Sequence, residues 1–235
     1  MSAGAVRRTP SADEARWTAV RDAFAPFATQ VRPCAGGVLL EEGPVPLAAT
    51  GAVWLPDPAR LEGRSDDDRR SAAHAWIVPS EAAVALAERT GRSAVLGLAL
   101  APDADASSGG PSLGGGTRGH GPRDRAWDGA AEVARRLARE AGAEASDWTD
   151  ALAVLLASWA AHDPDLRLIV DDATDAAAVV VERPDRTVVA LHAGGASLAR
   201  RLASEAVATG REALVVRAVD PDDAAAELVR LEPVA

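Results

Sequence analysis

Apolar residues recur at helical spacing early in the chain. They lie three or four residues apart and form one predicted helix face: Trp17, Val20, Phe24 and Phe27. Ser11 precedes this face, and Glu14 lies three residues after Ser11, which is the spacing of a capping box. The pattern predicts a first helix that begins after Ser11 and is brought to an end by Pro26 and Pro33.

Shorter apolar runs bounded by Gly, Pro and Asp follow, and such runs are typical of strands. In the first half we predict strands at residues 37–40, 51–55, 74–78 and 93–100, with a helix at 80–89 before the last of them. A helix at 128–141 closes the first half. In the second half we predict a helix at 146–161, strands at 166–170, 178–182 and 187–192, a helix at 196–208, a strand at 213–219 and a final helix at 222–231. The link Arg183-Pro184-Asp185-Arg186 predicts a hairpin between the strands that flank it.

The two halves repeat the order helix, three strands, helix, strand, helix, so we expect an α+β protein of two similar units related by duplication. Short landmarks repeat with that order: Trp17-Thr18 matches Trp148-Thr149, and Thr90-Gly91-Arg92 matches Thr209-Gly210-Arg211. The alternative is chance, because Ala-rich helices resemble one another. A duplicated pair would pack about a pseudo-twofold axis, and the groove between the units would be the first place to look for a ligand. In element order alone, with no shared motif, each unit is similar to the SseB-type domains of actinobacterial proteins.

Residues 102–125 differ from the rest of the chain in composition. Gly, Ser, Pro and Asp dominate this stretch and apolar residues are scarce, which predicts a flexible linker or loop. The expected domain organisation follows from it. A first unit spans residues 11–101, the linker spans 102–125, a connecting helix that belongs to the first unit spans 126–145, and a second unit spans 146–235.

Composition restricts the chemistry of the chain. The 235 residues carry a formal net charge of −10, and all 25 basic residues are Arg. This acidic balance argues against nucleic acid or an anionic membrane as the main partner, since phosphate binding needs a basic face. Lys, Asn and Tyr are absent, as a GC-rich genome explains, but the absence still removes every mechanism that needs Lys or Tyr. Walker-type nucleotide binding and Schiff-base chemistry are therefore excluded, and no cofactor is predicted.

The cysteine count and the hydropathy pattern bear on location. Cys34 is the single cysteine, so neither an intrachain disulfide nor a zinc site built on cysteines can form. No uncharged apolar stretch reaches the length of about 18 residues that a membrane span needs. Residues 1–10 lack the apolar core of a signal peptide. We therefore expect a cytoplasmic protein with no membrane partner.

The most suggestive segment runs from a predicted strand through a glycine pair into a predicted helix. Main-chain N–H groups at the helix start, with Arg side chains nearby, would suit an anionic ligand. The candidate binding residues are His192, Gly194, Gly195, Ser197, Arg200 and Arg211. The segment superficially resembles the first βαβ unit of a short-chain dehydrogenase, but its glycine spacing is not GxGxxG, and that family's catalytic Tyr and Lys do not exist here. The alternative is a Gly-rich turn before a helix.

Catalytic and metal motifs are not complete anywhere in the sequence. Gly195-Ala196-Ser197-Leu198-Ala199 nearly matches a GxSxG nucleophile elbow, but no His follows His192, which excludes the usual hydrolase order. A triad with an earlier His stays open, and a helix-cap role for Ser197 is the alternative. The histidines occur singly, at His74, His120, His162 and His192, so no metal site is predicted. Asp171, Asp172 and Asp175 could converge with His162-Asp163, or could serve as turn and cap residues.

Taken together, these patterns favour a non-catalytic protein-interaction or adaptor module with a protein partner, and an immunity or chaperone-like role belongs to that class. The alternative is a small-molecule-binding protein or enzyme that holds an anionic ligand at Gly194-Gly195. A structural or assembly subunit, which would form a homo-oligomer, is the third hypothesis. The six tryptophans are expected to anchor packing, and any that proves exposed is a candidate binding hot spot.

Overall fold

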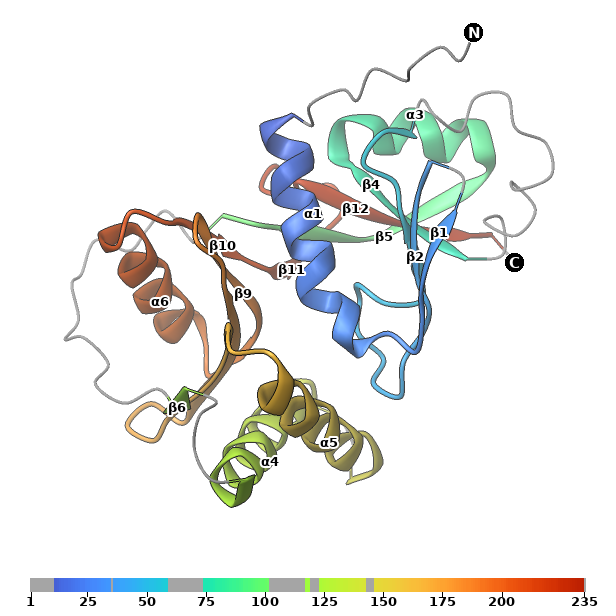
Figure 1. Cartoon of the computed structure of the whole chain (residues 1–235). Helices are drawn as coiled ribbons and strands as arrows, with labels where there is room; N and C mark the ends of the chain where they lie inside the picture. The colour runs from blue at the N-terminus through green and yellow to red at the C-terminus, as the bar shows by residue number, and fades with distance from the viewer. Residues whose placement is uncertain are drawn as a thin grey trace, which may run out of the picture.

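The structure, a computed structural model, describes residues 11–34, 36–58, 74–101, 117–118, 123–142 and 146–234. Helices and strands are mixed throughout these residues and the strands form two sheets, which confirms the α+β class (Figure 1). The helices are α1 (Ala12–Phe24), the short η1 (Ala25–Phe27), α3 (Ser80–Thr90), α4 (Arg123–Glu140), α5 (Ser146–His162) and α6 (Ala196–Ala208). Ser11 and Glu14 form the predicted capping box at the start of α1.

The first sheet has seven strands within the described residues, and its edge strands are β1 and β11. In spatial order they are β1 (Val31–Cys34), β2 (Gly37–Leu40), β3 (Ala52–Trp54), β4 (Ala75–Pro79), β12 (Leu228–Pro233), β5 (Arg92–Ala99) and β11 (Arg217–Val219). Strand β1 was not predicted from the sequence, because Pro33 lies in its middle. Proline is tolerated there because β1 is an edge strand, where one side of the ladder needs no N–H donor.

The second sheet has five strands in the part of the chain that the structure describes. In spatial order they are β10 (Glu212–Val215), β9 (Arg186–Ala193), β8 (Ala176–Glu182), β7 (Leu166–Asp171) and β6 (Thr117–Arg118). The predicted hairpin is confirmed, because β8 and β9 pair antiparallel on either side of its turn. Strands β9 and β10 pair in parallel, and α6 forms the crossover between them.

The final helix predicted at residues 222–231 is wrong. Its second half belongs to β12, which inserts antiparallel between β4 and β5. Leu228 is buried in the core between the sheets, whereas Val229 and Leu231 are buried under α3. Burial on both faces suits a central strand, and that tertiary pairing outweighs the helix preference of the Ala-rich residues before it.

The predicted duplication is not confirmed. In the repeat, α4 closes the first unit and should correspond to a final helix in the second unit. The chain forms the strand β12 there instead, and β12 joins the sheet of the first half. The repeated Thr-Gly-Arg landmark has a local cause instead. Gly91 and Gly210 follow α3 and α6 with φ of 67° and 75°, the left-handed conformation that ends helices at glycine.

The strand predicted at residues 213–219 divides between the two sheets. Its first part is β10, parallel to β9, and its second part is β11, antiparallel to β5. Val216 at the division is buried, and its N–H donates to Val189 O at 3.0 Å, while Val215 N–H donates to Leu100 O at 2.9 Å. The chain therefore passes from one sheet to the other without leaving the protein interior.

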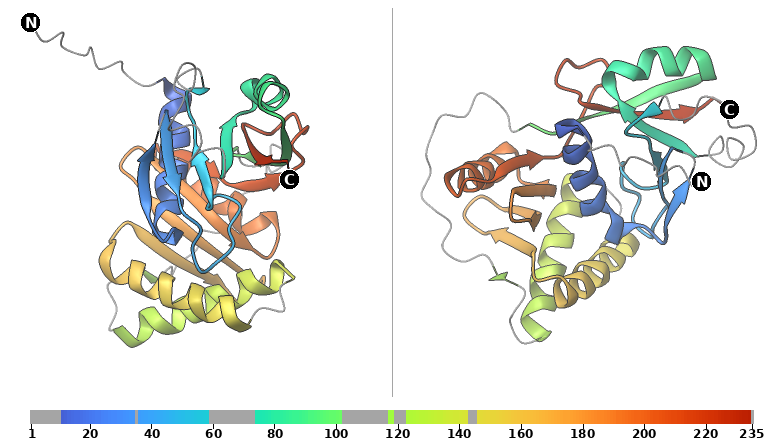
Figure 2. Two further views of the ribbon diagram at one scale, coloured as in Figure 1. Left: turned by 90° about the vertical axis from the view of Figure 1, so that its right-hand side faces the viewer. Right: turned by 45° about the horizontal axis from the view of Figure 1, so that its top comes forward.

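One hydrophobic core is shared by both halves of the chain. It takes side chains from α1, α4 and α5 and from one face of each sheet. The ribbon views of Figure 2 show how these helices lie against the sheets. Strand β8 illustrates the arrangement: Val179 and Val181 point into this core, while Ala178 and Val180 point toward α6 on the opposite face. Helix α3 covers the outer face of the first sheet in the same way.

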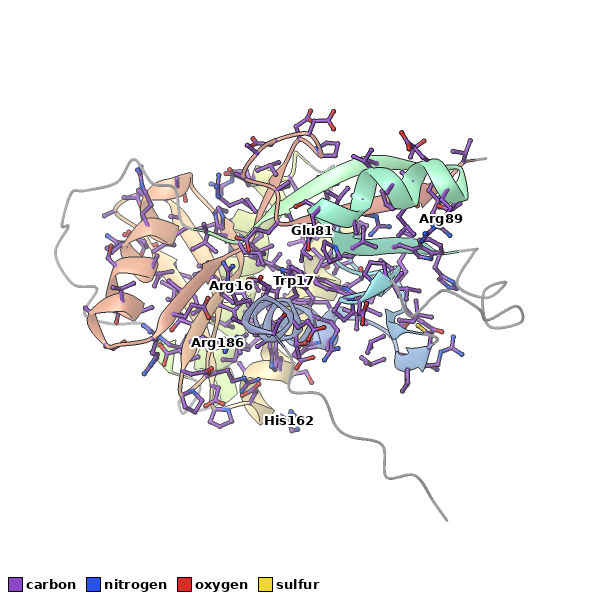
Figure 3. The ribbon with its side chains drawn as sticks, turned by 90° about the horizontal axis from the view of Figure 1, so that it is seen from above. Arg16, Trp17, Glu81, Arg89, His162 and Arg186 are labelled. Carbon is purple, nitrogen blue, oxygen red and sulfur yellow. The ribbon has the colours of Figure 1, made fainter. Side chains whose placement is uncertain are left out.

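Two arginines tie α1 to the strands of the second half. Arg16 on α1 forms ion pairs with Glu212 of β10 at 2.8 Å and with Glu227, just before β12, at 2.7 Å. Arg186 of β9 donates to Ala15 O on α1 at 3.0 Å. Figure 3, seen from above, shows both arginines beside α1. The first helix is therefore bonded to elements far from it in sequence.

Most of the predicted linker at residues 102–125 lies outside the described residues; within it, Thr117–Arg118 form β6 and α4 begins at Arg123. The connecting helix predicted at residues 126–145 overlaps α4, which ends at Glu140 and packs on α5 and on β7 and β8. Among the described residues, no helix has the length and apolar character needed to span a bilayer.

Candidate functional site

The predicted glycine turn lies between β9 and α6, and both of its glycines are required by geometry. Gly194 has φ of 85° and Gly195 has φ of 75°, which L side chains rarely adopt. A Cβ on Gly194 would lie 2.5 Å from the Cβ of Ala176, so β8 packs directly against the turn. A Cβ on Gly195 would meet nothing within 4 Å.

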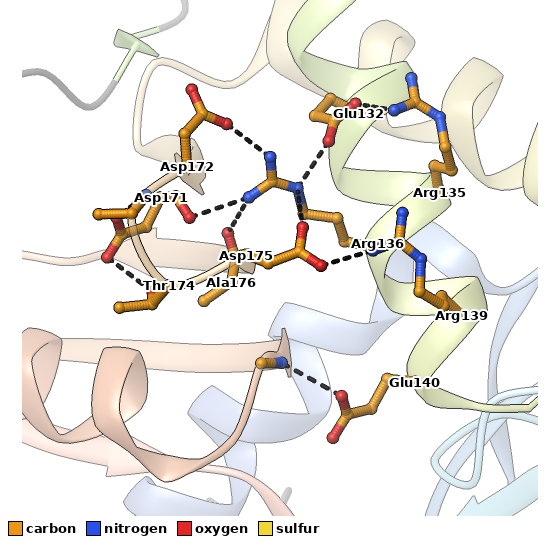
Figure 4. A network of polar contacts seen from close by, with 12 residues as sticks. Glu132, Arg135, Arg136, Arg139, Glu140, Asp171, Asp172, Thr174, Asp175 and Ala176 are labelled. Carbon is orange, nitrogen blue, oxygen red and sulfur yellow. Dashed lines mark hydrogen bonds and ion pairs between the residues drawn. The ribbon is translucent and has the colours of Figure 1, made fainter.

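One main-chain N–H group of this turn is engaged by the chain itself. Gly194 N–H donates to the carboxylate of Glu140, at the end of α4, with a distance of 3.2 Å (Figure 4). Gly194 precedes the N-cap residue Gly195, so this N–H lies outside the first turn of α6. The anion site expected at this turn stays a prediction.

The candidate residues do not all come together. Ser197 is exposed in the first turn of α6, and no hydrogen bond or ion pair to it is found within the described chain, so it lacks the base that a nucleophile requires. Arg200 is half-buried one turn further on, likewise without a partner among the residues described. His192 ends β9 beside the turn and is partnered. Arg211 lies beyond the other end of α6, about 20 Å away along the helix, and pairs with Glu182 at 3.3 Å.

A buried arginine that sequence reasoning did not single out organises the region next to the turn. Arg136 on α4 is buried, and its guanidinium donates to Asp171 O at 2.9 Å, to Ala176 O at 3.0 Å and to the carboxylate of Asp172 at 2.5 Å. Its Nε donates to Glu132, one turn earlier on α4, at 2.6 Å. Figure 4 shows α4 joined to the β7–β8 turn through this side chain and through the pairing of Arg139 with Asp175. Arg136 therefore holds the turn that supports Gly194.

Asp171, Asp172 and Asp175 have the turn role that was the alternative to convergence with His162-Asp163, which lies before the opposite end of β7. Arginines neutralise this turn. Arg201 of α6 pairs with Asp171, and this hydrogen bond holds the pKa of the Asp171 carboxyl below its usual value. Arg139 pairs with Asp175 at 2.5 Å. Within the described part of the chain, no group of three or more His, Cys, Asp or Glu side chains could hold a metal ion.

The tryptophans separate into buried anchors and one exposed ring. Trp17, Trp54 and Trp76 are buried, and Trp148 and Trp159 pack partly buried against the core. Trp159 meets the Phe27 ring edge-on at 5.4 Å, which joins α5 to η1. Trp127 on α4 is 47% exposed. The sequence prediction that exposed tryptophans mark binding sites applies to this residue and stays a prediction.

A second candidate site is the outer side of β5. Strand β12 covers one side of β5 along its length, whereas β11 covers the other side only at residues 97–99. Residues 93–96 of β5, called the open edge below, therefore have no strand on their outer side among the described residues. Ser93, Ala94 and Val95 are exposed there, Val95 by 48%. Unpaired main-chain N–H and C=O groups in such a stretch are a template for another strand.

The opposite edge of this sheet, strand β1, is protected against strand addition. Edge strand β1 carries Pro33, which has no N–H, and the charged Arg32 paired with Glu41. Charges, proline and β-bulges are among the means by which proteins discourage strand addition. The open edge contains neither charge nor proline, and the pairing of β12 with β5 shifts register within it, between Ala94 and Leu96.

The open edge is held rigidly at its start. The Arg92 side chain is buried, stacks 3.7 Å from the centroid of the Trp76 ring and donates to His74 O at 2.7 Å. These contacts join the beginning of β5 to β4 across the intervening β12. An edge whose first residue is already fixed loses less conformational entropy when a strand is added to it.

An acidic loop lies beside the open edge. The connection between β11 and β12 crosses β5 at Gly97, where a Cβ would lie 2.7 Å from Asp220 O, so only glycine permits the crossing. Asp220, Asp222 and Asp223 are exposed in this loop. The carboxylate of Asp222 has no partner within the described chain, which leaves it available to a cation.

None of the family models, curated proteins or solved structures compared with the chain matches it.

Proposed function

We propose that the protein is a non-catalytic interaction module that binds an extended, basic segment of a partner protein by strand addition to the open edge of β5. The observation that carries this proposal is the exposed, unpaired and uncharged stretch at residues 93–96, beside a strand that is otherwise fully paired. Main-chain hydrogen bonds would supply affinity, and side chains alternating along the added strand would supply specificity. The cytoplasmic location expected from the sequence belongs to this proposal.

The charge of the loop beside the edge selects the partner. Three exposed carboxylates, Asp220, Asp222 and Asp223, favour Lys or Arg in the added segment. The net charge of −10 on the whole chain acts in the same direction at longer range and disfavours nucleic acid. Pairing of two copies of this chain through the same edge would bring the acidic loops together, which works against a homo-oligomer of this kind.

The test is selection from a random peptide library displayed as segments of about ten residues, long enough to form one strand. The full chain should enrich basic peptides with alternating apolar residues. Val95→Lys and Asp222→Lys should each weaken the selected peptide by about tenfold or more, because both place positive charge beside a basic strand.

Matched controls lie on α5, away from the edge. Val154 is 53% exposed and Asp150 is exposed, so Val154→Lys and Asp150→Lys make the same changes of side chain elsewhere. They should leave peptide binding unchanged. Peptides that bind with no basic preference, or equal losses in the control variants, would contradict the proposal.

A second function is favoured by one observation at the glycine turn. Gly195 caps α6 without a side-chain hydrogen bond, and the partner-free Arg200 lies one turn away, so an anion larger than a carboxylate would find donors there. Thermal shift with inorganic phosphate and small carboxylates tests it. A stabilisation of several degrees that is lost in Arg200→Ala would favour ligand binding at this turn, and no shift would argue against it.

A further inference from the structure

A cavity of about 620 Å³ lies on the first sheet, apart from the glycine turn. Two of its lining residues, Arg230 and Glu232, belong to β12, the strand that pairs with the open edge of β5. The cavity is bounded by the connection between β2 and β3 and by the ends of β4 and β12, and its lining includes Glu42, Gly51, His74, Arg230 and Glu232. The volume is in the range of small-molecule sites. Its lining is rich in charged side chains of both signs.

Arg230 is the fixed cation of this cavity. Its side chain is 17% exposed, and two of its three nitrogens are engaged: Nε donates to Glu232 at 2.7 Å, and Nη1 donates to Ala48 O at 2.7 Å and Thr50 O at 2.8 Å. No described residue accepts a hydrogen bond from Nη2. The guanidinium is therefore held in place with one N–H₂ group left to bind a carboxylate.

Glu42 is the free anion of the same cavity. Its side chain is exposed, and within the described chain no donor reaches its carboxylate. Gly51 separates it from Arg230: a Cβ there would lie 3.6 Å from Glu42 Cβ and 3.9 Å from Arg230 Nη2. The missing side chain leaves a space between an unpaired carboxylate and an unpaired guanidinium edge.

From this juxtaposition we infer that the cavity binds a free α-amino acid, with basic amino acids bound most tightly. The ligand carboxylate pairs with Arg230 Nη2, and an ammonium group pairs with Glu42. Glu41 and Glu232 also line the cavity, and the pairing of Glu41 with Arg32 leaves one excess negative charge. A ligand with two ammonium groups and one carboxylate balances that charge.

Calorimetric titration of the full chain with L-lysine tests the inference, with cadaverine as the analogue that lacks the carboxylate. Lysine should bind about tenfold or more tightly than cadaverine, because only lysine gains the charge-assisted bond to Arg230. Glu42→Gln should weaken the binding of lysine by about tenfold or more. This variant alters an exposed side chain with no partner in the described structure, so its melting temperature should match that of the unmodified chain.

Glu88→Gln on α3 is the matched control, because Glu88 is exposed and lies on the opposite face of the sheet. It should bind lysine as the unmodified chain does. Equal binding of lysine and cadaverine, unchanged binding by Glu42→Gln, or no binding at concentrations up to about 10 mM would each overturn the inference. Peptide binding at the open edge is tested separately by Val95→Lys, which changes no residue of the cavity lining.

Discussion

At the scale of single residues, the two glycines of the β9–α6 turn have different reasons to be glycine. Gly194 has both a positive φ and Ala176 against it, whereas Gly195 has the positive φ alone. Gly195→Ala should therefore cost about 1–3 kcal/mol of unfolding free energy, because its φ of 75° and ψ of −176° form a combination that almost only glycine adopts. Gly194→Ala should cost about 2–4 kcal/mol, because overpacking against Ala176 adds to the penalty of its positive φ. Urea denaturation of both variants measures the difference, and equal costs would show that the contact with Ala176 relaxes freely.

Asp171 should make stability depend on pH in the acid range. Its hydrogen bond from Arg201 lowers the folded-state pKa, so the unfolded chain takes up the proton first as pH falls. The unfolding free energy should decline as pH falls from about 5 through the folded-state pKa.

The variant Asp171→Asn isolates this contribution. It should lose about 1–3 kcal/mol at pH 7 through the broken charge-assisted bond, and its stability should decline less steeply toward acid. Other carboxylates with lowered pKa, such as Glu132 and Glu182, remain in the variant and set the residual slope. Parallel curves for the two proteins would show that Asp171 does not carry the effect.

At the scale of elements, features that depend on neighbouring residues were predicted from the sequence, whereas the pairing of distant strands was not. The capping box at Ser11 and the glycine after α3 depend only on residues close together in the sequence, so both were predicted. The strand character of Leu228–Pro233 comes from β4 and β5, which lie more than a hundred residues earlier in the sequence. Arg136 was missed for the same reason: its role depends on main-chain carbonyls of the β7–β8 turn, which no spacing on α4 reveals.

Arg136 should be the main polar attachment of α4 to the second sheet. Arg136→Ala would leave the carbonyls of Asp171 and Ala176 without their buried donor, and we expect a loss of about 3–5 kcal/mol. Arg135→Ala is the matched control, since Arg135 is an exposed neighbour whose ion pair is to Glu132, and should cost less than about 1 kcal/mol. Chemical denaturation compares the two variants, and a similar cost for both would contradict the assigned role.

At the scale of the whole molecule, the C-terminal half of the chain contributes strands to the sheet of the N-terminal half. Strands β11 and β12 from the C-terminal half complete the sheet of the N-terminal half. A fragment of residues 11–101 would leave β4 and β5 without the strand between them and should not fold cooperatively. Circular dichroism during thermal unfolding tests this expectation, and a sharp transition in the fragment would show that the first half is an independent unit.

The most direct test of the proposed interaction is hydrogen–deuterium exchange of the full chain, alone and with the basic peptide selected from the library. Amides in the open edge at residues 93–96 that face away from β12 should exchange quickly in the free protein and be protected in the complex. The exchange rates of amides in β9 and β10 should be the same in the free protein and in the complex. Protection confined to Trp127 and its neighbours on α4, or to the glycine turn, with no change at the open edge, would contradict the account.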